Sequence, residues 1–285
     1  MTPFDDTICA LGEGPLWQPE TQTLFWFDIL GKRLLSRRHD KTRVWQFDRH
    51  FSAAGRVDAN TLILASQDAL WRFDVASGDM AQICPLEADN PVTRSNDGRA
   101  DPWGGFWIGS MGKQMEKGAG AIYRFYRGEL RQLVDDITVS NAICFAPGRG
   151  VGYYADTPTR QIMQVALDAD TGWPLDAPQI FADLRDARLN PDGAVSDAQG
   201  NLWVACWGAG CVICLDRSGD ERARIEVPAR QPSCPAFGGA DLRDLYITSA
   251  AQSLNGDALQ NQPMNGATFV IKDVAQGLPE PLVIL

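Results

Sequence analysis

Histidine is rare in this chain, and acidic side chains outnumber basic ones. Only two histidines occur among 285 residues, and 36 Asp and Glu against 26 Lys and Arg give a formal net charge of −10. Such a chain lacks the basic surface that neutralises phosphates, so we expect no nucleic-acid partner. Docking on an anionic membrane is disfavoured for the same reason. The composition favours a small molecule as the partner.

Long hydrophobic runs and targeting segments are also missing. The longest apolar stretch runs from Leu202 to Leu215, is interrupted by Gly208 and Gly210, and is too short to span a bilayer. The first residues, MTPFDDTICALGEG, contain neither the basic region nor the apolar region of a secretory signal. We therefore expect a cytoplasmic protein with no membrane partner.

The cysteines do not form a disulfide or zinc pattern. Their number, seven, is odd, and they are scattered along the chain, which favours reduced thiols. Cys211 and Cys214 form a CxxC, but CVICL is typical of a strand, in which positions i and i+3 face opposite sides. No second CxxC or paired histidine completes a zinc site. We expect these cysteines to be buried as small hydrophobic side chains.

No long segment has the 3.6-residue period of an amphipathic helix, whereas short β-rich runs recur between turn sequences such as PGRG, DAQGN and RSGDE. This pattern predicts an all-β protein. The expected strands are 23–30, 61–66, 69–75, 106–111, 121–126, 151–157, 161–167, 201–207, 211–216, 244–250 and 267–273.

Similar segments recur at steps of 41, 42, 45, 51 and 41 residues. The repeats start at Glu13, Ala54, Asn96, Asn141, Asp192 and Ser233. A period of this size fits one four-stranded antiparallel blade per repeat, and six repeats fill residues 1–285 as a single domain. The sequence therefore predicts a six-bladed β-propeller around a central channel. We expect the repeated tryptophans to pack between blades, namely Trp26, Trp71, Trp107 and Trp203.

Four polar residues share one phase of this repeat: Glu13, Asn96, Asn141 and Asp192. A single Asp or Asn at a turn is ordinarily explained by turn geometry. Here, however, all four precede strands that should line the channel, at one height around one axis. Two carboxylates and two carboxamides gathered there form an oxygen-rich ring, which suits a hard divalent cation.

The same residues lie in motifs that resemble one protein family. EGPLW at 13–17, RSNDGRADPWGGFWIGSM at 94–111, TVSNAICFAP, NPDGAVSDAQGNLWVACWGAG and the C-terminal PMNGATFVI occur in this order. Together they resemble the gluconolactonase, regucalcin (senescence marker protein) and luciferin-regenerating enzyme family of six-bladed propellers, of the bacterial sugar lactonase type. The resemblance extends over effectively the full length of the chain.

The resemblance implies a role for individual residues. Glu13, Asn141 and Asp192 match the family's ligands to one divalent cation, and Asp192 matches its catalytic Asp. Arg94 and Asn96 match residues that contact substrate. Glu116 matches an acidic residue that holds sugar hydroxyls in some members. The chain departs from the family at Ala142, where glycine often follows the Asn, and this residue could narrow the backbone freedom beside the ligand.

The residues also indicate chemistry without the family. Two carboxylates and an amide oxygen suit Ca²⁺, Mg²⁺, Mn²⁺ or Zn²⁺ with open positions, and no thiolate or imidazole selects a softer metal. The chain contains neither GxSxG nor HExxH, and His39 and His50 fall outside every motif. A carboxylate must therefore move the proton during hydrolysis, and Asp192 is the candidate base.

Three functions remain open at this point. The main hypothesis is a metal-dependent sugar lactonase, a hydrolase of carboxylic esters that opens an aldono-1,4- or 1,5-lactone to the aldonic acid. A paraoxonase-like esterase or phosphotriesterase would use the same cation. A calcium-binding regulatory propeller without turnover would need no substrate contacts. We expect a monomer or a weak oligomer, and the sequence identifies neither the sugar, modified sugars included, nor the native metal.

Overall fold

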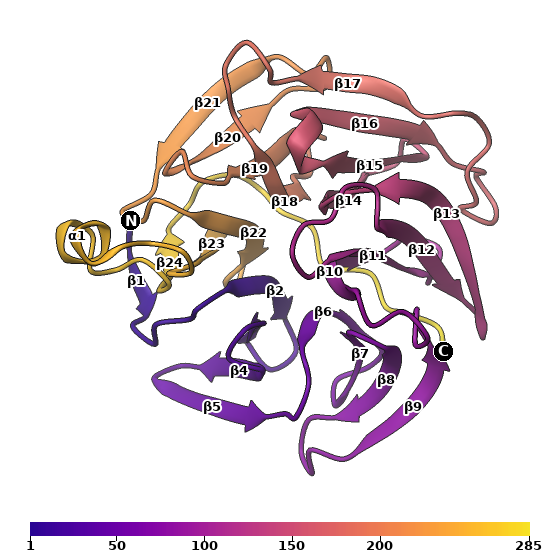
Figure 1. Ribbon diagram of the computed structural model, residues 1–285, viewed down its shortest axis with the longest axis horizontal. Helices are drawn as coiled ribbons and strands as arrows, with labels where there is room; N and C mark the ends of the chain where they lie inside the picture. The colour runs from indigo at the N-terminus through magenta and orange to yellow at the C-terminus, as the bar shows by residue number, and fades with distance from the viewer.

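Six four-stranded antiparallel sheets form the blades of a ring, which confirms the six-bladed β-propeller predicted from the repeat (Figure 1). The computed structural model describes the backbone of residues 1–285 and the side chains of all residues except 257, 258 and 261. The first strands of the six blades are β2, β6, β10, β14, β18 and β22, and each contacts the first strands of its neighbours around the axis.

Each of the first five blades uses four strands that are consecutive in the chain. Blade 1 contains β2 (Gly12–Gln18), β3 (Thr23–Asp28), β4 (Arg33–Arg38) and β5 (Lys41–Gln46), and blade 2 contains β6 (Phe51–Arg56), β7 (Thr61–Ser66), β8 (Ala69–Asp74) and β9 (Met80–Pro85). Blade 3 contains β10 (Thr93–Ala100), β11 (Phe106–Gly112), β12 (Gly120–Tyr126) and β13 (Glu129–Ile137). Blade 4 contains β14 (Ser140–Ala146), β15 (Val151–Asp156), β16 (Gln161–Ala166) and β17 (Gln179–Asp183). Blade 5 contains β18 (Pro191–Ser196), β19 (Leu202–Cys206), β20 (Cys211–Leu215) and β21 (Glu221–Glu226).

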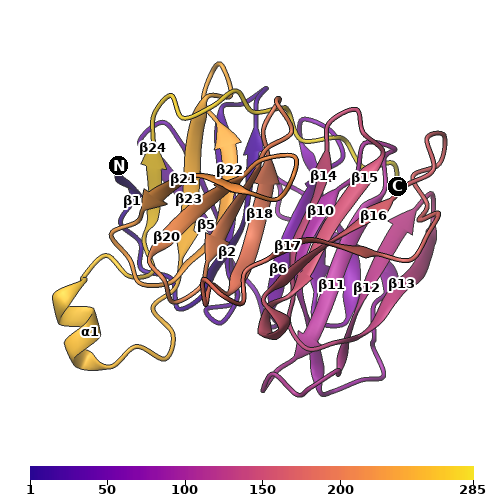
Figure 2. The same ribbon diagram turned by 90° about the horizontal axis from the view of Figure 1, so that it is seen from above.

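Blade 6 joins the two ends of the chain. It contains β22 (Pro232–Gly238), β23 (Asp244–Ser249), β24 (Thr268–Ile271) and, at its outer edge, the N-terminal strand β1 (Thr2–Asp5). Backbone pairing of β1 with β24 closes the ring without a covalent bond. A 3₁₀ turn, η1 (Thr157–Thr159), follows β15, and the helix α1 (Gly256–Asn261) stands out from the ring between β23 and β24 (Figure 2). Within the described structure, no helix is long and apolar enough to cross a membrane.

The hydrophobic core is divided among the interfaces between blades. Trp26 packs in the cluster of blades 1 and 6, Trp107 in that of blades 3 and 4, and Trp203 in that of blades 5 and 6. Trp71 is partly buried against the cluster of blades 1 and 2. The structural role predicted for these tryptophans is therefore confirmed.

The cysteines follow the same arrangement. Cys211 packs between blades 4 and 5, whereas Cys214 packs between blades 5 and 6, so the two thiols of the CxxC face opposite sides of one strand. In the described structure all seven cysteines are free thiols; six are buried, as predicted, whereas Cys84 is only partly buried.

The segment after β24 crosses one face of the ring and ends beside blades 2 and 3 (Figures 1 and 2). Val283 is buried in the hydrophobic cluster of these two blades, and its backbone N–H donates to the carbonyl of Arg56. Glu280 forms an ion pair with Arg99, a residue near the end of the inner strand β10. The two side chains are only 10% and 11% exposed, so water screens the pair poorly.

We expect Glu280→Gln to destabilise the protein, because it leaves the Arg99 guanidinium charged and buried without its partner. The free energy of unfolding should fall by roughly 3 kcal/mol in a denaturant titration. Glu129→Gln is the matched control, because the Glu129–Arg131 pair is more than half exposed and its loss should cost under about 1 kcal/mol. Equal effects of the two substitutions would contradict a stabilising role for the crossing segment.

Candidate active site

A β-bulge interrupts each inner strand that carries a residue of the predicted ring. The register shifts between Glu13 and Leu16, Ser95 and Gly98, Asn141 and Cys144, and Pro191 and Ala194. Bulges redirect side chains from the faces of a sheet. As a result Glu13, Asn96, Asn141 and Asp192 all line one cavity at the same end of the channel.

The backbone at two of these bulges lies in the left-handed region. Gly14, after Glu13, and Ala142, after Asn141, both have φ of 54°. Glycine adopts this conformation freely, whereas alanine does so at a cost of about 1 kcal/mol. Ala142 therefore keeps the glycine-like geometry that its position requires, and the Asn141 side chain still reaches the cavity.

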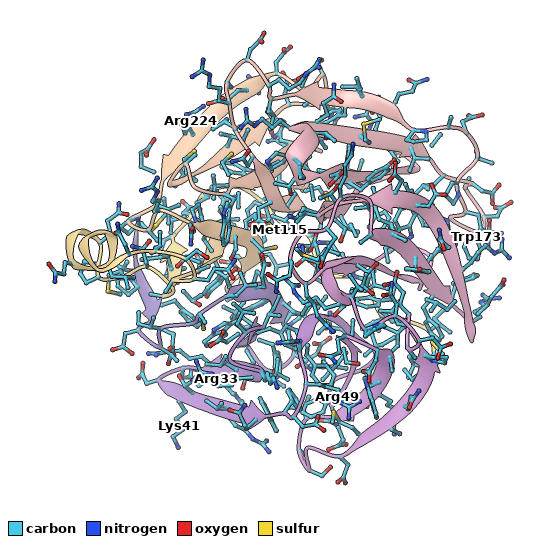
Figure 3. The ribbon with its side chains drawn as sticks, in the orientation of Figure 1. Arg33, Lys41, Arg49, Met115, Trp173 and Arg224 are labelled. Carbon is cyan, nitrogen blue, oxygen red and sulfur yellow. The ribbon has the colours of Figure 1, made fainter. Side chains whose placement is uncertain are left out.

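The cavity has a volume of about 370 Å³ and a charged, buried floor. Five polar residues on the floor are each at most 7% exposed, namely Glu13, Arg94, Asn96, Asn141 and Asp192. The rim carries uncharged polar side chains, among them Asn190, Gln231, Gln252 and Ser253, and Trp207. Met115 lies over the middle of the ring, at the mouth of the cavity (Figure 3).

The floor holds two acidic side chains against one basic side chain. Burial and the nearby Asp97 raise the pKa of Glu13 to about 8. Burial and the charge of Glu13 raise the pKa of Asp192 well above its ordinary value. Arg94 opposes both carboxylates, and its own burial lowers its pKa to about 10. One guanidinium does not compensate these buried acids, so a bound cation would stabilise their ionised forms.

A chain of hydrogen bonds links three of the floor residues. Nη1 of Arg94 donates to Oδ1 of Asn96 at 2.8 Å and to the Ser95 carbonyl at 2.8 Å. Nδ2 of Asn96 donates to Oδ1 of Asn141 at 3.1 Å and to the Ser140 carbonyl at 2.8 Å. Both amide hydrogens of Asn96 are therefore used within the protein, and Asn96 orients its neighbours as well as lining the cavity.

Five of the six predicted site residues line the cavity, and Glu116 does not. Its Oε2 accepts a hydrogen bond from the backbone N–H of Gln114 at 2.9 Å, within the loop between β11 and β12. Met115 from this loop reaches the cavity mouth instead. A contact between Glu116 and a sugar hydroxyl stays a prediction.

Several cavity residues were not identified from the sequence. Thr157 and Pro158 come from η1, Gln231 directly precedes β22, and Gln252 and Ser253 lie in the connection between β23 and β24. Gln231 and Asn190 stand two residues before the repeat starts Ser233 and Asp192, at the phase of Arg94, so periodicity could have indicated both. Thr157, Pro158, Gln252 and Ser253 lie in connections between strands, where the repeat carries no signal.

The donor set fits a hard cation only when an amide oxygen is included. Among the described side chains, no group of three or more His, Cys, Asp or Glu is placed to hold a metal ion. Glu13 and Asp192 supply two carboxylates, and Asn141 supplies a neutral carbonyl oxygen. These oxygen donors, together with the uncompensated charge, fit Ca²⁺, Mg²⁺, Mn²⁺ or Zn²⁺.

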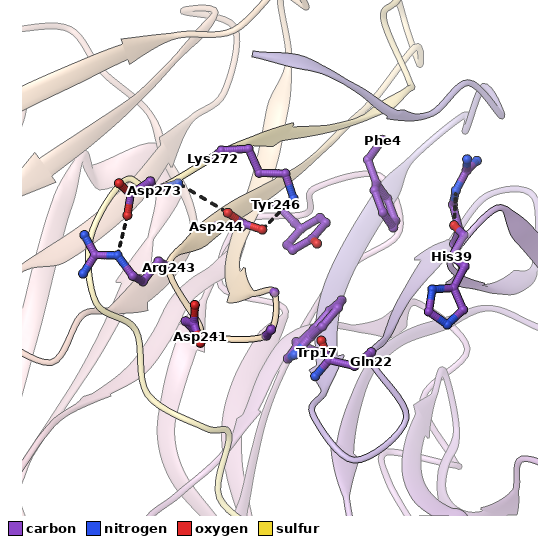
Figure 4. A pocket seen from close by; sticks show the side chains of 13 residues that line it. Phe4, Trp17, Gln22, His39, Asp241, Arg243, Asp244, Tyr246, Lys272 and Asp273 are labelled. Atoms are coloured by element: carbon purple, nitrogen blue, oxygen red, sulfur yellow. Dashed lines mark hydrogen bonds and ion pairs between the residues drawn. The ribbon is translucent and has the colours of Figure 1, made fainter.

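A larger groove of about 600 Å³ lies between blades 1 and 6, outside the channel (Figure 4). Phe4, Trp17 and Tyr246 contribute aromatic rings to it, and Lys272 pairs with Asp244 there. The other cationic side chains of its lining are also paired, Arg37 with Asp5 and Arg243 with Asp273. His39 lines this groove and His50 contacts Gln67, so neither histidine belongs to the described lining of the channel cavity, as predicted.

Comparison with known proteins agrees with the motifs. The SMP-30/Gluconolactonase/LRE-like region matches residues 11–251. The chain is 33% identical over 280 residues to 6-deoxy-6-sulfogluconolactonase of Pseudomonas putida, covering 96% of this chain and 94% of that one. It is 33% identical over 281 residues to L-arabinolactonase of Azospirillum brasilense, covering 96% and 92%. The crystal structure of a calcium-binding protein, regucalcin, from Agrobacterium tumefaciens strain C58 superposes with a TM-score of 0.98 at 39% identity, over 100% of this chain and 97% of that one. The chain therefore belongs to the SMP-30/gluconolactonase/LRE-like family, which confirms the resemblance noted in its sequence.

Proposed function

We propose that the protein is a sugar lactonase, a carboxylic ester hydrolase that opens a neutral aldono-1,4- or 1,5-lactone to the aldonic acid with one divalent cation. The observation that carries this proposal is the buried floor on which two under-compensated carboxylates and an amide oxygen lie beside Arg94. Relatives that bear the names 6-deoxy-6-sulfogluconolactonase and L-arabinolactonase support the reaction class.

Four of the five floor residues act directly in this reaction. Glu13, Asn141 and Asp192 would hold the cation, which when bound supplies a Lewis acid to the lactone carbonyl. Asp192 takes the proton from the attacking water, because no histidine belongs to the described lining of the cavity. Arg94 keeps Nε and Nη2 free of the bonds to Ser95 and Asn96, and these N–H groups can donate to the lactone oxygens.

The cavity favours neutral substrates. Among the described side chains that line it, Arg94 is the one cation, and it lies beside Glu13 and Asp192. A sulfonate or carboxylate on the far end of the sugar would meet uncharged rim residues such as Gln252, and no described side chain of the rim supplies a cation to pair with it.

Asp192→Asn tests the proposed base. The substitution removes the proton acceptor and one charge of the cation site, so kcat on an aldonolactone should fall by about 10²–10⁴-fold in a pH-indicator assay. Chelation of the wild type should abolish acid release, and Mn²⁺, Zn²⁺ or Ca²⁺ should restore it. The surface variant Asp79→Asn is the control. A near-wild-type rate for Asp192→Asn would remove it as the base, and full activity after chelation would contradict the cation.

The same assay separates the two rival functions. Tight metal binding without hydrolysis of any lactone would favour the calcium-binding regulatory protein. Faster turnover of a phosphotriester or an aryl ester than of gluconolactone, galactonolactone or arabinonolactone would favour the paraoxonase-like enzyme.

Glu13→Gln should stabilise the metal-free protein while abolishing its response to metal. The pKa of Glu13 is raised from 4.5 to about 8, so ionisation of Glu13 destabilises the folded state as pH rises through this range. In EDTA near pH 9 the variant should melt above the wild type, at about 2–4 °C per kcal/mol. Mn²⁺ should raise the Tm of the wild type and of the exposed control Glu129→Gln but not that of Glu13→Gln. A lower metal-free Tm, or a retained response to Mn²⁺, would contradict the assignment of Glu13.

Gln252→Arg tests the preference for neutral lactones. The wild type should show a higher kcat/KM on D-gluconolactone than on its 6-deoxy-6-sulfo counterpart. A new guanidinium at the rim should raise kcat/KM on the sulfonated lactone by about tenfold or more, because a hydrogen bond to a charged group contributes about 1.5–3 kcal/mol. Gln252→Glu is the matched control and should not show this gain. A wild-type preference for the sulfonated lactone would overturn the charge argument.

A further inference from the structure

Thr157 connects two blades at the cavity floor. It is the first residue of η1, directly after β15, and its backbone N–H donates to the Val139 carbonyl at 3.0 Å. Its Oγ1 accepts a hydrogen bond from Nδ2 of Asn141 at 2.8 Å. The same oxygen donates to the carbonyl of Pro191, the residue before Asp192, at 2.7 Å. One hydroxyl therefore bridges the Asn141 carboxamide in blade 4 and the start of β18 in blade 5.

The direction of each hydrogen bond in this chain follows from its two ends. A guanidinium such as that of Arg94 can only donate, and a carbonyl such as that of Pro191 can only accept. The single hydroxyl hydrogen of Thr157 is used on Pro191, so Oγ1 must accept from the Asn141 amide. At the other end, Asn96 turns Oδ1 to Arg94 and Nδ2 to Asn141. The hydrogen bonds to Asn96 and to Thr157 therefore fix the orientation of the Asn141 carboxamide.

Reversal of the Asn141 carboxamide would be doubly unfavourable. Its oxygen would then face Thr157 Oγ1, which has no hydrogen left to donate, and its N–H₂ would face the N–H₂ of Asn96. A reversed amide would also present positive N–H groups where a cation ligand is needed. Only the observed orientation places Oδ1 of Asn141 on the Asn96 side, where this oxygen can act as a cation ligand.

We infer that Thr157 is a positioning residue for the cation site. It holds the Asn141 carboxamide with Oδ1 available as a ligand. Its hydrogen bond to Pro191 also links that carboxamide to the backbone immediately before Asp192. This inference rests on the proposed function, because it takes Asn141 Oδ1 and Asp192 as ligands of one cation. Outer residues that orient metal ligands commonly alter metal affinity by 10- to 100-fold when replaced.

Thr157→Val tests this role, because valine has a similar shape but neither accepts from Asn141 nor donates to Pro191. In calorimetric titrations of chelator-treated protein, Mn²⁺ should bind about 10- to 100-fold more weakly than to the wild type. The Mn²⁺ concentration that half-restores lactonase activity should shift by the same factor. Thr157→Ser keeps the hydroxyl and should bind Mn²⁺ within about threefold of the wild type. Thr157→Ala serves as a second hydroxyl-free variant if the valine variant does not fold.

Thr159→Val is the matched control in the same turn. Thr159 Oγ1 donates to the Asp156 carbonyl, not to a cavity residue. Wild-type Mn²⁺ affinity in Thr157→Val, or an equal loss in Thr159→Val, would overturn the inference.

A second readout does not depend on metal. In the metal-free wild type, the Asn141 side-chain N–H₂ protons should exchange slowly with solvent in ¹H–¹⁵N NMR spectra, and this protection should be lost in Thr157→Val. Unchanged protection would overturn the inference. If the wild type binds no Mn²⁺ and opens no lactone, the proposed function fails, while the amide protons still decide whether Thr157 positions Asn141.

Discussion

Closure of the ring is the constraint on which the rest of the structure depends. Pairing of β1 with β24 completes blade 6, and the six inner strands then face one another around a single axis. Any polar side chain directed to that axis loses its water and must find a partner inside the protein. The packing between blades supplies the free energy that allows Glu13 and Asp192 to remain there despite their mutual repulsion.

The bulges explain how a regular sheet can hold this site. A strict pleat would send Glu13 and Asn141 into the interfaces between blades, but the bulged backbone turns them to the axis. The cost appears in the left-handed φ of Gly14 and Ala142, of which only the glycine is free of strain. Because Ala142 is buried and packed in the interface of blades 4 and 5, that interface can hold the strained backbone in place.

The sequence predicted those features of the structure that follow from its internal repeat. Equal steps between similar segments indicated six blades, and a shared phase indicated that Glu13, Asn96, Asn141 and Asp192 would meet in space, as the cavity shows. Contacts that cross the repeat had no such signal. The closing strand β1, the bridge through Thr157 and the pair of Glu280 with Arg99 each join segments whose distance in space is set by the closed ring, not by local pattern.

Two buried arginines, Arg94 and Arg99, interact with different acidic side chains along the channel. Burial raises the pKa of Asp97 to about 6. The carboxylate of Asp97 interacts electrostatically with Arg99 and with Asp192 in the cavity. Glu280 from the crossing segment pairs with Arg99, and the charge of Arg99 also acts on Asp97. The positive charge that acts on Glu13 and Asp192 is instead that of Arg94. In the proposed function, a divalent cation would compensate the charge of Glu13 and Asp192 that this single guanidinium leaves unbalanced.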